Sequence, residues 1–273
     1  MSMARVLIVA GSDSGGGAGI QADIKTVTAL QGYAMTAVTA VTAQNTQGVQ
    51  AVHGLPADFI DAQMRSVLSD IGADCIKTGM LHSPEVIATV TDLIAELAPD
   101  VPLVLDPVMV AQSGDRLVPE AAMQALCTQL IPRASLITPN IPEAEALLGQ
   151  RIETADGLLE AAQALLELGC KAVLLKGGHL RSEHLIDVLV TGTGHYEWRH
   201  ERIHTTSDHG TGCTLASAIA EGLGRGLGLH HSIARAEAFL QRALALAVPL
   251  GHGHGPVNHL HTISAFKTGI IEA

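Results

Sequence analysis

Aromatic residues are almost absent from this 273-residue chain, which contains three Phe, two Tyr and one Trp. So few aromatic side chains cannot build a platform on which nucleobases stack. Basic residues are scarce as well, since 16 Lys and Arg stand against 27 Asp and Glu and give a formal net charge of −11. An acidic surface repels the phosphate backbone of DNA and RNA, so we expect no nucleic-acid partner.

Cysteine pairs and long apolar runs are also missing. The four cysteines are scattered without a C-x-x-C pair: Cys75, Cys127, Cys170 and Cys213. No stretch reaches the roughly 18 uncharged apolar residues that a membrane span needs. The apolar run 6–10 is too short for an export signal and is followed by Gly11 and Asp13. We therefore expect free thiols in a cytoplasmic protein that does not enter a membrane.

Short β-branched runs alternate with segments in which apolar residues recur at helical spacing, a pattern typical of a parallel α/β sheet. The predicted strands are residues 5–10, 35–43, 75–78, 103–106, 135–138 and 172–176. These runs are apolar throughout, as expected when helices cover both faces of the sheet. With no repeat and no linker, the sequence predicts one α/β domain over residues 1–273, with a mostly parallel central sheet and helices on both faces.

Local signals place several elements between these strands. Apolar residues 59–71 after Pro56 predict one helix, and residues 158–168, closed by Gly169, predict another. Residues 188–191 and 194–198 are typical of a polar-edged antiparallel hairpin, and the chain after Thr211 reads as mostly helical.

Polar residues, glycines and prolines follow all six predicted strands. They include Gln44, Lys77, Asp106, Asn140, Glu143 and Lys176. In open α/β sheets, ligands bind beyond the carboxyl ends of the strands. Because six strand ends carry such residues, the sequence predicts a binding site at this edge rather than a set of ordinary turns.

The first Gly-rich segment, residues 11–19, matches neither common nucleotide motif. Its Gly17-x-Gly19-x-x-Ala22 pattern begins seven residues past the strand, and no carboxylate occurs between Asp23 and Asp58 to hold a ribose. The chain has no G-x-x-x-x-G-K-[ST] sequence. The remaining interpretations are a flexible loop and a loop whose backbone comes close to a small ligand.

The second Gly-rich segment, residues 208–213, leads directly into the apolar run 214–219, which predicts a buried helix. A glycine-lined helix N-terminus offers free N–H groups and a positive dipole to a phosphoryl group. Cys213 falls in the first turn, where a thiol pKa is lowered, so it could act as a base toward an alcohol. The alternative is a small residue that only packs.

Two further features have open interpretations. Asp23 falls beside the apolar face of the helix after the first loop, where it either faces the site or complements the helix dipole. Near the C-terminus, His252, His254, His259 and His261 have H-x-H spacing. No matching Cys or carboxylate cluster accompanies them, which favours solvated or capping roles over a metal site.

Taken in order, the motifs resemble those of hydroxymethylpyrimidine/phosphomethylpyrimidine kinases of thiamine biosynthesis. The matching segments are residues 10–23, 43–46, 77–81, 106–109, 138–144, 176–179, 209–214 and 253–259. The resemblance runs from residue 5 to about residue 261, nearly the whole chain. It implies a ribokinase-like fold, ATP with Mg²⁺, and two phosphorylations that convert 4-amino-5-hydroxymethyl-2-methylpyrimidine to its monophosphate and then to the diphosphate. Members of the family also phosphorylate pyridoxal or pyridoxine to varying degrees.

The resemblance also implies roles for residues. Gly11, Asp23, Gln44, Met80 and Val108 would line the pyrimidine pocket. Gly210, Thr211 and Gly212 would form the anion hole with Cys213 as base, while Asn140 and Lys176 would hold the ATP phosphates and Asp106 and Glu143 the metal. A homodimer is the expected assembly.

One departure and two alternatives accompany this resemblance. The family pattern leads us to expect Asn and then Thr or Ser before His209, but this chain has Ser207 and Asp208. An inward carboxylate there would weaken phosphate binding, and we expect it to point outward.

The alternative functions are a pyridoxal or pyridoxine kinase of the same fold and a catalytically silent pyrimidine-binding sensor. The presence of Asp106 and Lys176 argues against the sensor, because a pure binder does not need them.

Overall fold

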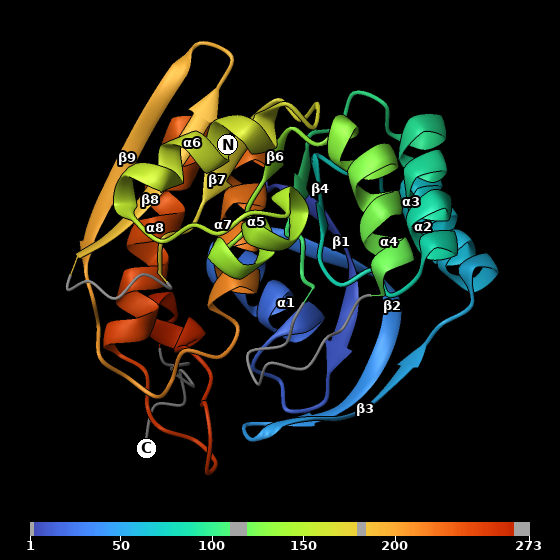
Figure 1. The fold of residues 1–273 in the computed structure, drawn as a ribbon. Coiled ribbons are helices and arrows are strands. Elements are labelled where there is room, and N and C mark those ends of the chain that lie inside the picture. Colours follow the sequence, from blue (N-terminus) through green and yellow to red (C-terminus); the bar gives the residue numbers. More distant parts are fainter. Residues whose placement is uncertain (1–2, 110–118, 179–183, 265–273) are drawn as a thin grey trace, which may run out of the picture.

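The computed structural model describes residues 3–109, 119–178 and 184–264 (Figure 1). Its strands are β1 (Arg5–Asp13), β2 (Tyr33–Asn45), β3 (Gly48–Gly54), β4 (Cys75–Thr78), β5 (Leu103–Leu105), β6 (Leu136–Ile137), β7 (Ala172–Leu175), β8 (His184–Thr191) and β9 (Gly194–Glu201). They form one sheet in the order β3-β2-β1-β4-β5-β6-β7-β8-β9. All six strands and the hairpin predicted from the sequence are present.

The central pairings, from β2 across to β7, are parallel, and antiparallel hairpins extend the sheet at both edges. The prediction of a mostly parallel sheet is therefore confirmed. Strand β3 was not predicted from the sequence. It lies at the edge with most of its side chains exposed or half-buried, so its sequence carries no apolar run.

Helices cover both faces of the sheet, as predicted. They are α1 (Gly19–Ala29), α2 (Ala57–Asp70), α3 (Pro84–Leu97), α4 (Glu120–Ala125), α5 (Ile141–Leu148), α6 (Ala155–Leu166), α7 (Thr211–Gly224) and α8 (Leu229–Ala245). Figure 1 shows α1, α7 and α8 on one face and α2, α3 and α4 on the other. No helix within the described ranges is both long and apolar enough to cross a bilayer.

Strand β1 shows why the strands are apolar on both sides. Val6 and Ile8 pack with residues of α1, α7 and α8, whereas Leu7 and Val9 pack into the core beneath α2 to α6. All four side chains are fully buried. Successive side chains of a strand point to opposite faces, so covering both faces requires an uninterrupted apolar run.

Strand β1 is also the point where the strand order reverses, because it pairs with β2 on one side and with β4 on the other. The loops that leave the carboxyl ends of these strands diverge there and leave a crevice between them. The two Gly-rich segments lie at this edge: one follows β1, and the other precedes α7.

Candidate active site

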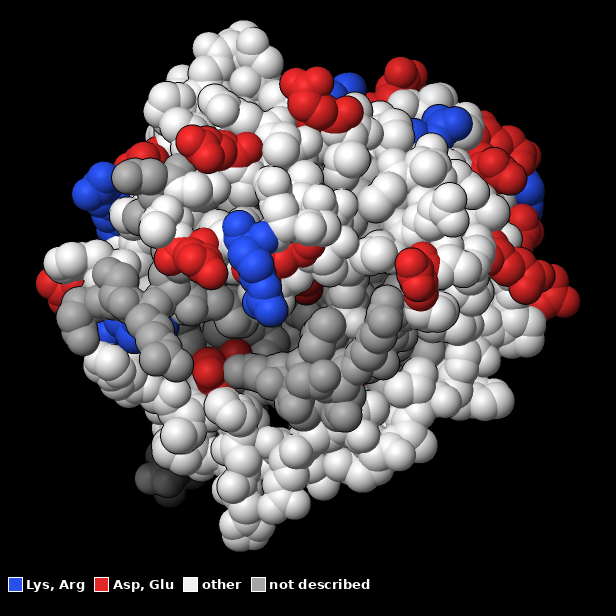
Figure 2. Space-filling view, in the orientation of Figure 1, with Lys and Arg blue, Asp and Glu red and all other residues white. Residues whose placement is uncertain are grey.

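A cavity of about 390 Å³ lies at the carboxyl edge of the sheet, within the usual size range of small-molecule pockets. Every site residue predicted from the sequence lines it except Asp23. These residues are Gly11, Gln44, Met80, Asp106, Val108, Asn140, Glu143, Lys176, Gly210, Thr211, Gly212 and Cys213. The face drawn in Figure 2 is hollowed near its centre, where acidic atoms are visible. Residue His179, part of one predicted motif, lies outside the described residues.

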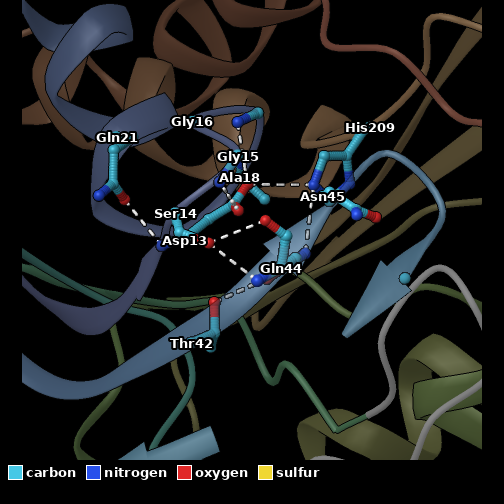
Figure 3. Close-up of polar contacts among 12 residues, drawn as sticks. Asp13, Ser14, Gly15, Gly16, Ala18, Gln21, Thr42, Gln44, Asn45 and His209 are labelled. Carbon is cyan, nitrogen blue, oxygen red and sulfur yellow. Dashed lines mark hydrogen bonds and ion pairs between the residues drawn. The ribbon is translucent and has the colours of Figure 1, made fainter. Parts of the chain in front are cut away.

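Asp13 organises the first Gly-rich loop (Figure 3). Its Oδ1 accepts the N–H of Gly15 at 2.7 Å, and its Oδ2 accepts those of Gly17 at 2.9 Å and Ala18 at 2.8 Å. His209 Nε2 lies 3.1 Å from the same Oδ2. Burial alone would raise the pKa of Asp13, but the hydrogen bonds from His209 and the loop outweigh it and hold the pKa below its usual value. A charged Asp13 thus ties this loop to the second Gly-rich segment.

The two Gly-rich segments touch through their backbones. A Cβ on Gly210, which has φ +83°, would lie 1.9 Å from the carbonyl oxygen of Gly17. A Cβ on Gly17 would lie 2.4 Å from the His209 ring. Glycine is required at both positions by this close approach, so the first loop is a packed wall of the cavity rather than a flexible connection.

Gln44 lies at the end of β2 with its side-chain amide among polar groups. Its Oε1 accepts from Thr42 Oγ1 at 3.2 Å, and its Nε2 lies 3.3 Å from His209 Nε2. Ser14 Oγ bonds both the N–H and the carbonyl of Gln44 at 2.8 Å. The backbone of Gln44 is therefore pinned to the first loop, and its amide is oriented at the cavity wall (Figure 3).

Helix α7 begins at the cavity with Gly210 as its N-cap. The first N–H groups of a helix have no partner within the helix, so those of Gly212 and Cys213 are available to an anion. A Cβ on Gly212 would lie 3.3 Å from Lys176 Nζ and 3.5 Å from Asp106 Oδ2. A cationic side chain and a carboxylate thus flank the helix N-terminus.

The expected low pKa of Cys213 is wrong. Burial raises the pKa of its thiol to about 12, against the lowering effect of the Lys77 ammonium and with the help of the Asp23 and Asp106 carboxylates. The helix N-terminus favours a thiolate, but desolvation beside two carboxylates outweighs it. The thiol lines the cavity and keeps its proton at neutral pH.

Asp23 does not line the cavity, which corrects its expected place in the pyrimidine pocket. It is fully buried and accepts from Lys77 Nζ at 2.9 and 3.0 Å and from Ser217 Oγ at 2.7 Å. Burial would lower the pKa of Lys77, but the Asp23 carboxylate, helped by Asp106, outweighs it and raises that pKa above its usual value. Asp23 therefore holds a charged lysine at the cavity floor, because a buried ammonium needs a carboxylate partner.

Asp106, Lys176 and Glu143 form the charged part of the cavity. Thr138 Oγ1 at 3.0 Å and Lys176 Nζ at 3.2 Å both contact Asp106 Oδ1. Asp106 and Glu143 are only 3% and 5% exposed. Burial raises the pKa of Glu143 to about 7, opposed by Lys176 and reinforced by Asp106. Two hard carboxylates that lack full charge compensation fit a Mg²⁺ ion, which prefers oxygen ligands.

Asn140 caps the helix that carries Glu143. Its side chain accepts the Glu143 N–H at 2.9 Å, and Glu143 Oε2 accepts the Asn140 N–H at 2.8 Å. This reciprocal capping box fixes both side chains at the start of α5. The backbone of Asn140 also bridges to Lys176, so the predicted phosphate and metal residues are linked by one set of contacts.

Asp208, the departure from the family pattern, points away from the cavity as expected. Its carboxylate contacts His254 Nδ1 at 2.7 Å, and it is not among the lining residues. Of the other three C-terminal histidines, His259 Nε2 lies 2.9 Å from Thr214 Oγ1, in the first turn of α7. His259 is buried, so the solvated or capping role predicted for it is wrong.

Protonation of His259 is expected to destabilise the fold in acid. Burial, with small contributions from Lys25 and His261, lowers the pKa of His259 from 6.5 to about 4. Between these values the unfolded chain binds a proton that the native state does not, so the free energy of unfolding falls as pH decreases from 6.5 to 4. The expected loss is on the order of 3 kcal/mol.

Urea unfolding across this pH range measures the effect. His259→Gln should flatten the decline, because glutamine binds no proton, whereas His195→Gln on the exposed strand β9 should leave the wild-type slope unchanged. Equal slopes for wild type and His259→Gln would refute the assignment.

No individual role was predicted from the sequence for three ionisable residues of the cavity lining: Asp13, Lys77 and His209. Lys77 was already among the residues placed at this sheet edge, and its need for a buried partner could have been predicted, because it lies inside an apolar strand. Asp13 at the mouth of a Gly-rich loop also carries a weak local signal. His209 contacts Asp13 across 196 residues of chain, and no local pattern predicts that contact.

Known proteins resemble this chain in sequence and in fold. A model of the family described as phosphomethylpyrimidine kinase matches residues 13–258. The hydroxymethylpyrimidine/phosphomethylpyrimidine kinase of Streptomyces coelicolor is 46% identical over 93% of both chains. A thiamine biosynthesis bifunctional protein of Geobacter sulfurreducens is 50% identical over 93% of this chain, which spans 52% of that protein's length. In an ADP complex, Bacillus subtilis pyridoxal kinase superposes with a TM-score of 0.87 at 37% identity, covering 95% of this chain and 98% of that one.

Proposed function

This chain belongs to the phosphomethylpyrimidine kinase family, and we propose that it phosphorylates 4-amino-5-hydroxymethyl-2-methylpyrimidine and then its monophosphate, using ATP. The observation that carries the proposal is one cavity that combines an oriented amide, Gln44, with a glycine-lined helix N-terminus and the cation Lys176. The amide offers a donor and an acceptor to an aminopyrimidine edge. The other two features suit a transferring phosphoryl group.

Phosphoryl transfer demands positioning and charge neutralisation more than covalent chemistry by the protein. The N–H groups at the start of α7 would hold the oxygens of the transferring group, and Lys176 would neutralise their charge. Asn140 would orient the ATP phosphates beside Lys176, with which its backbone is bridged. Gly11, Met80 and Val108 would enclose the pyrimidine ring.

We place the Mg²⁺ of the reaction on Asp106 and Glu143, where it would neutralise charge on the ATP phosphates. The support is the charge imbalance at these two buried carboxylates. Lys176 already contacts Asp106 Oδ1, and a Cβ on Gly212 would lie 3.5 Å from Oδ2, so the second oxygen faces the anion-binding helix.

Cys213 is proposed as the group that takes the substrate hydroxyl proton. Because its thiol keeps its proton at neutral pH, only the small ionised fraction can act. Lys77 favours that fraction. The rate should therefore rise with pH.

The competing function is a pyridoxal or pyridoxine kinase, which the likeness to the solved pyridoxal kinase keeps open. A catalytically silent sensor has less support, since the cavity retains the complete charged set. One assay separates the three: ATP consumption with hydroxymethylpyrimidine, its monophosphate and pyridoxal in parallel. The proposal requires diphosphate formation from the monophosphate and no activity on ribose or fructose. Pyridoxal as the best substrate, or no ATP consumption, would refute it.

Gln44→Ala is expected to lower kcat/KM for hydroxymethylpyrimidine by about one to two decades, or 1–3 kcal/mol. The reason is that the polar edge of the buried pyrimidine would lose its partner, while ATP affinity should barely change. Gln50→Ala on the exposed strand β3 is a matched control and should behave as wild type. A comparable loss of ATP affinity in Gln44→Ala would move this residue to the nucleotide side of the cavity.

The homodimer stays a prediction, which light scattering after size exclusion will test. The cytoplasmic location also stays a prediction. The absence of a nucleic-acid partner likewise stays a prediction. On the face drawn in Figure 2, the Lys and Arg side chains of the described residues are scattered among Asp and Glu.

A further inference from the structure

A second group of ionisable side chains lies away from the kinase cavity, between the β8–β9 hairpin and α8. Asp187 comes from β8, His200 from β9 and Glu237 from α8. One potential ligand atom from each side chain lies within 4.8 Å of the other two. Asp187 is 8% exposed and Glu237 2%, whereas the His200 side chain is 17% exposed. None of these residues lines the kinase cavity.

Two of the polar atoms that converge here lack a hydrogen-bond partner. Within the described part of the chain, Glu237 Oε1 and His200 Nε2 are buried without a hydrogen bond. His200 Nε2 lies 3.4 Å from Glu237 Oε2, close enough for an ion pair but without hydrogen-bond geometry. Asp187 Oδ1 accepts the Gly177 N–H at 2.7 Å. Burying a carboxylate oxygen without a partner is costly, so the arrangement points to an additional group that these atoms bind.

The charge of the group leads to the same conclusion. Two carboxyl groups lie together in a buried place and share a hydrogen bond. Burial raises the pKa of both Asp187 and Glu237, the Asp187 charge raises that of Glu237 further, and His200 opposes the rise only at Asp187. Lys176 acts in the opposite direction on both, but its ammonium contacts Asp106 in the kinase cavity. A bound cation would balance the two carboxylates without drawing Lys176 from that cavity.

We propose that Asp187, His200 and Glu237 form a binding site for a divalent transition-metal ion of the Zn²⁺ class. Ligands bonded at 2.0–2.1 Å in a tetrahedral site lie about 3.4 Å apart, and His200 Nε2 and Glu237 Oε2 have this separation. The imidazole favours Zn²⁺, or Co²⁺ in its place, over Mg²⁺, which prefers oxygen ligands. A fourth position would be filled by water, and the half-buried edge of His200 provides the entry path.

The metal would tie three elements together. Strands β8 and β9 would be linked to α8, and Asp187 would extend the link to Gly177, the residue that follows Lys176. The role is structural, because the ligands contact no part of the kinase cavity. The proposal does not depend on the kinase function and is tested without substrate.

The experiment uses full-length protein, stripped with a chelator and dialysed, without ATP. Zn²⁺ is titrated and bound metal is counted by elemental analysis after equilibrium dialysis, and Co²⁺ is followed by its visible absorption. Wild type should bind one equivalent more than His200→Ala, and saturating Zn²⁺ should raise its Tm by about 5–10 °C. His195→Ala, on the exposed side of the same strand, is the matched control and should bind as wild type.

Glu237→Gln serves as a second variant, because it keeps the shape of the side chain if His200→Ala folds poorly. It should also lose the extra equivalent and the Co²⁺ absorption. The difference in bound Zn²⁺ equivalents between wild type and each variant reports this site alone, because Zn²⁺ bound by the other histidines or by the kinase cavity is present in both proteins. If wild type takes up no more Zn²⁺ than Glu237→Gln, the three side chains share protons instead and the metal site is wrong.

Discussion

Replacing Cys213 by Ala is expected to lower kcat by about two to four decades, the usual contribution of a general base. Binding of the pyrimidine should change little, because the groups that hold the phosphoryl oxygens are backbone N–H groups at the start of α7. Steady-state kinetics with hydroxymethylpyrimidine and Mg-ATP measure both parameters.

The pH dependence of kcat tests the role of Cys213 as general base more sharply than a rate measured at one pH. Because burial raises the pKa of Cys213 to about 12, its thiolate fraction increases about tenfold for each pH unit below that value. The kcat of the wild type should therefore rise with pH above neutrality, and the Cys213→Ala variant should lose this rise. The titration of Glu143 near pH 7 remains in both proteins and so cancels in the comparison.

Cys213→Asp separates the base from a packing residue. A carboxylate can accept the same proton, and Lys77 is near enough to stabilise its charge, so this variant should retain more activity than Cys213→Ala. If Cys213 only packs, Ala would stay nearly fully active and Asp would be damaging as an added buried charge. That pair of results would remove Cys213 from the mechanism.

Asp23→Ala is expected to lower the free energy of unfolding by about 3–5 kcal/mol. The variant leaves the Lys77 ammonium buried without a carboxylate, since both side chains are fully buried and pair at 2.9 Å. Removing one partner of a buried ion pair exposes the full cost of desolvating the other. Urea unfolding at pH 7 measures the loss.

Two controls define this result. Asp61→Ala breaks an exposed pair with Arg65 and should cost only about 0.3–0.5 kcal/mol. Asp23→Ala combined with Lys77→Met removes both buried charges and should recover much of the lost stability. If the double variant is as unstable as Asp23→Ala, the cost comes from lost packing and not from the unpaired charge.

The mostly parallel sheet, and the sheet edge at which the cavity lies, follow from local signals in the sequence. Each buried strand is a short apolar run because both of its faces pack against helices, as Val6 and Leu7 illustrate. The residues after those runs, such as Asp106 and Lys176, meet at one sheet edge because parallel strands end there together. These features depend on local periodicity and on strand direction, which a sequence carries in short windows.

The partners of the charged residues emerge only from the folded chain. Asp23 was predicted to line the pocket, but in the structure it pairs with Lys77, 54 residues away in the sequence. Similarly, His209 contacts Asp13 across 196 residues of sequence. The thiol of Cys213 has a raised pKa because burial and two carboxylates outweigh the helix dipole, a balance that depends on neighbours distant in sequence. Contacts between residues that are distant in sequence, and the low dielectric around buried charged groups, exist only in the folded chain. No local pattern of residues therefore predicts them.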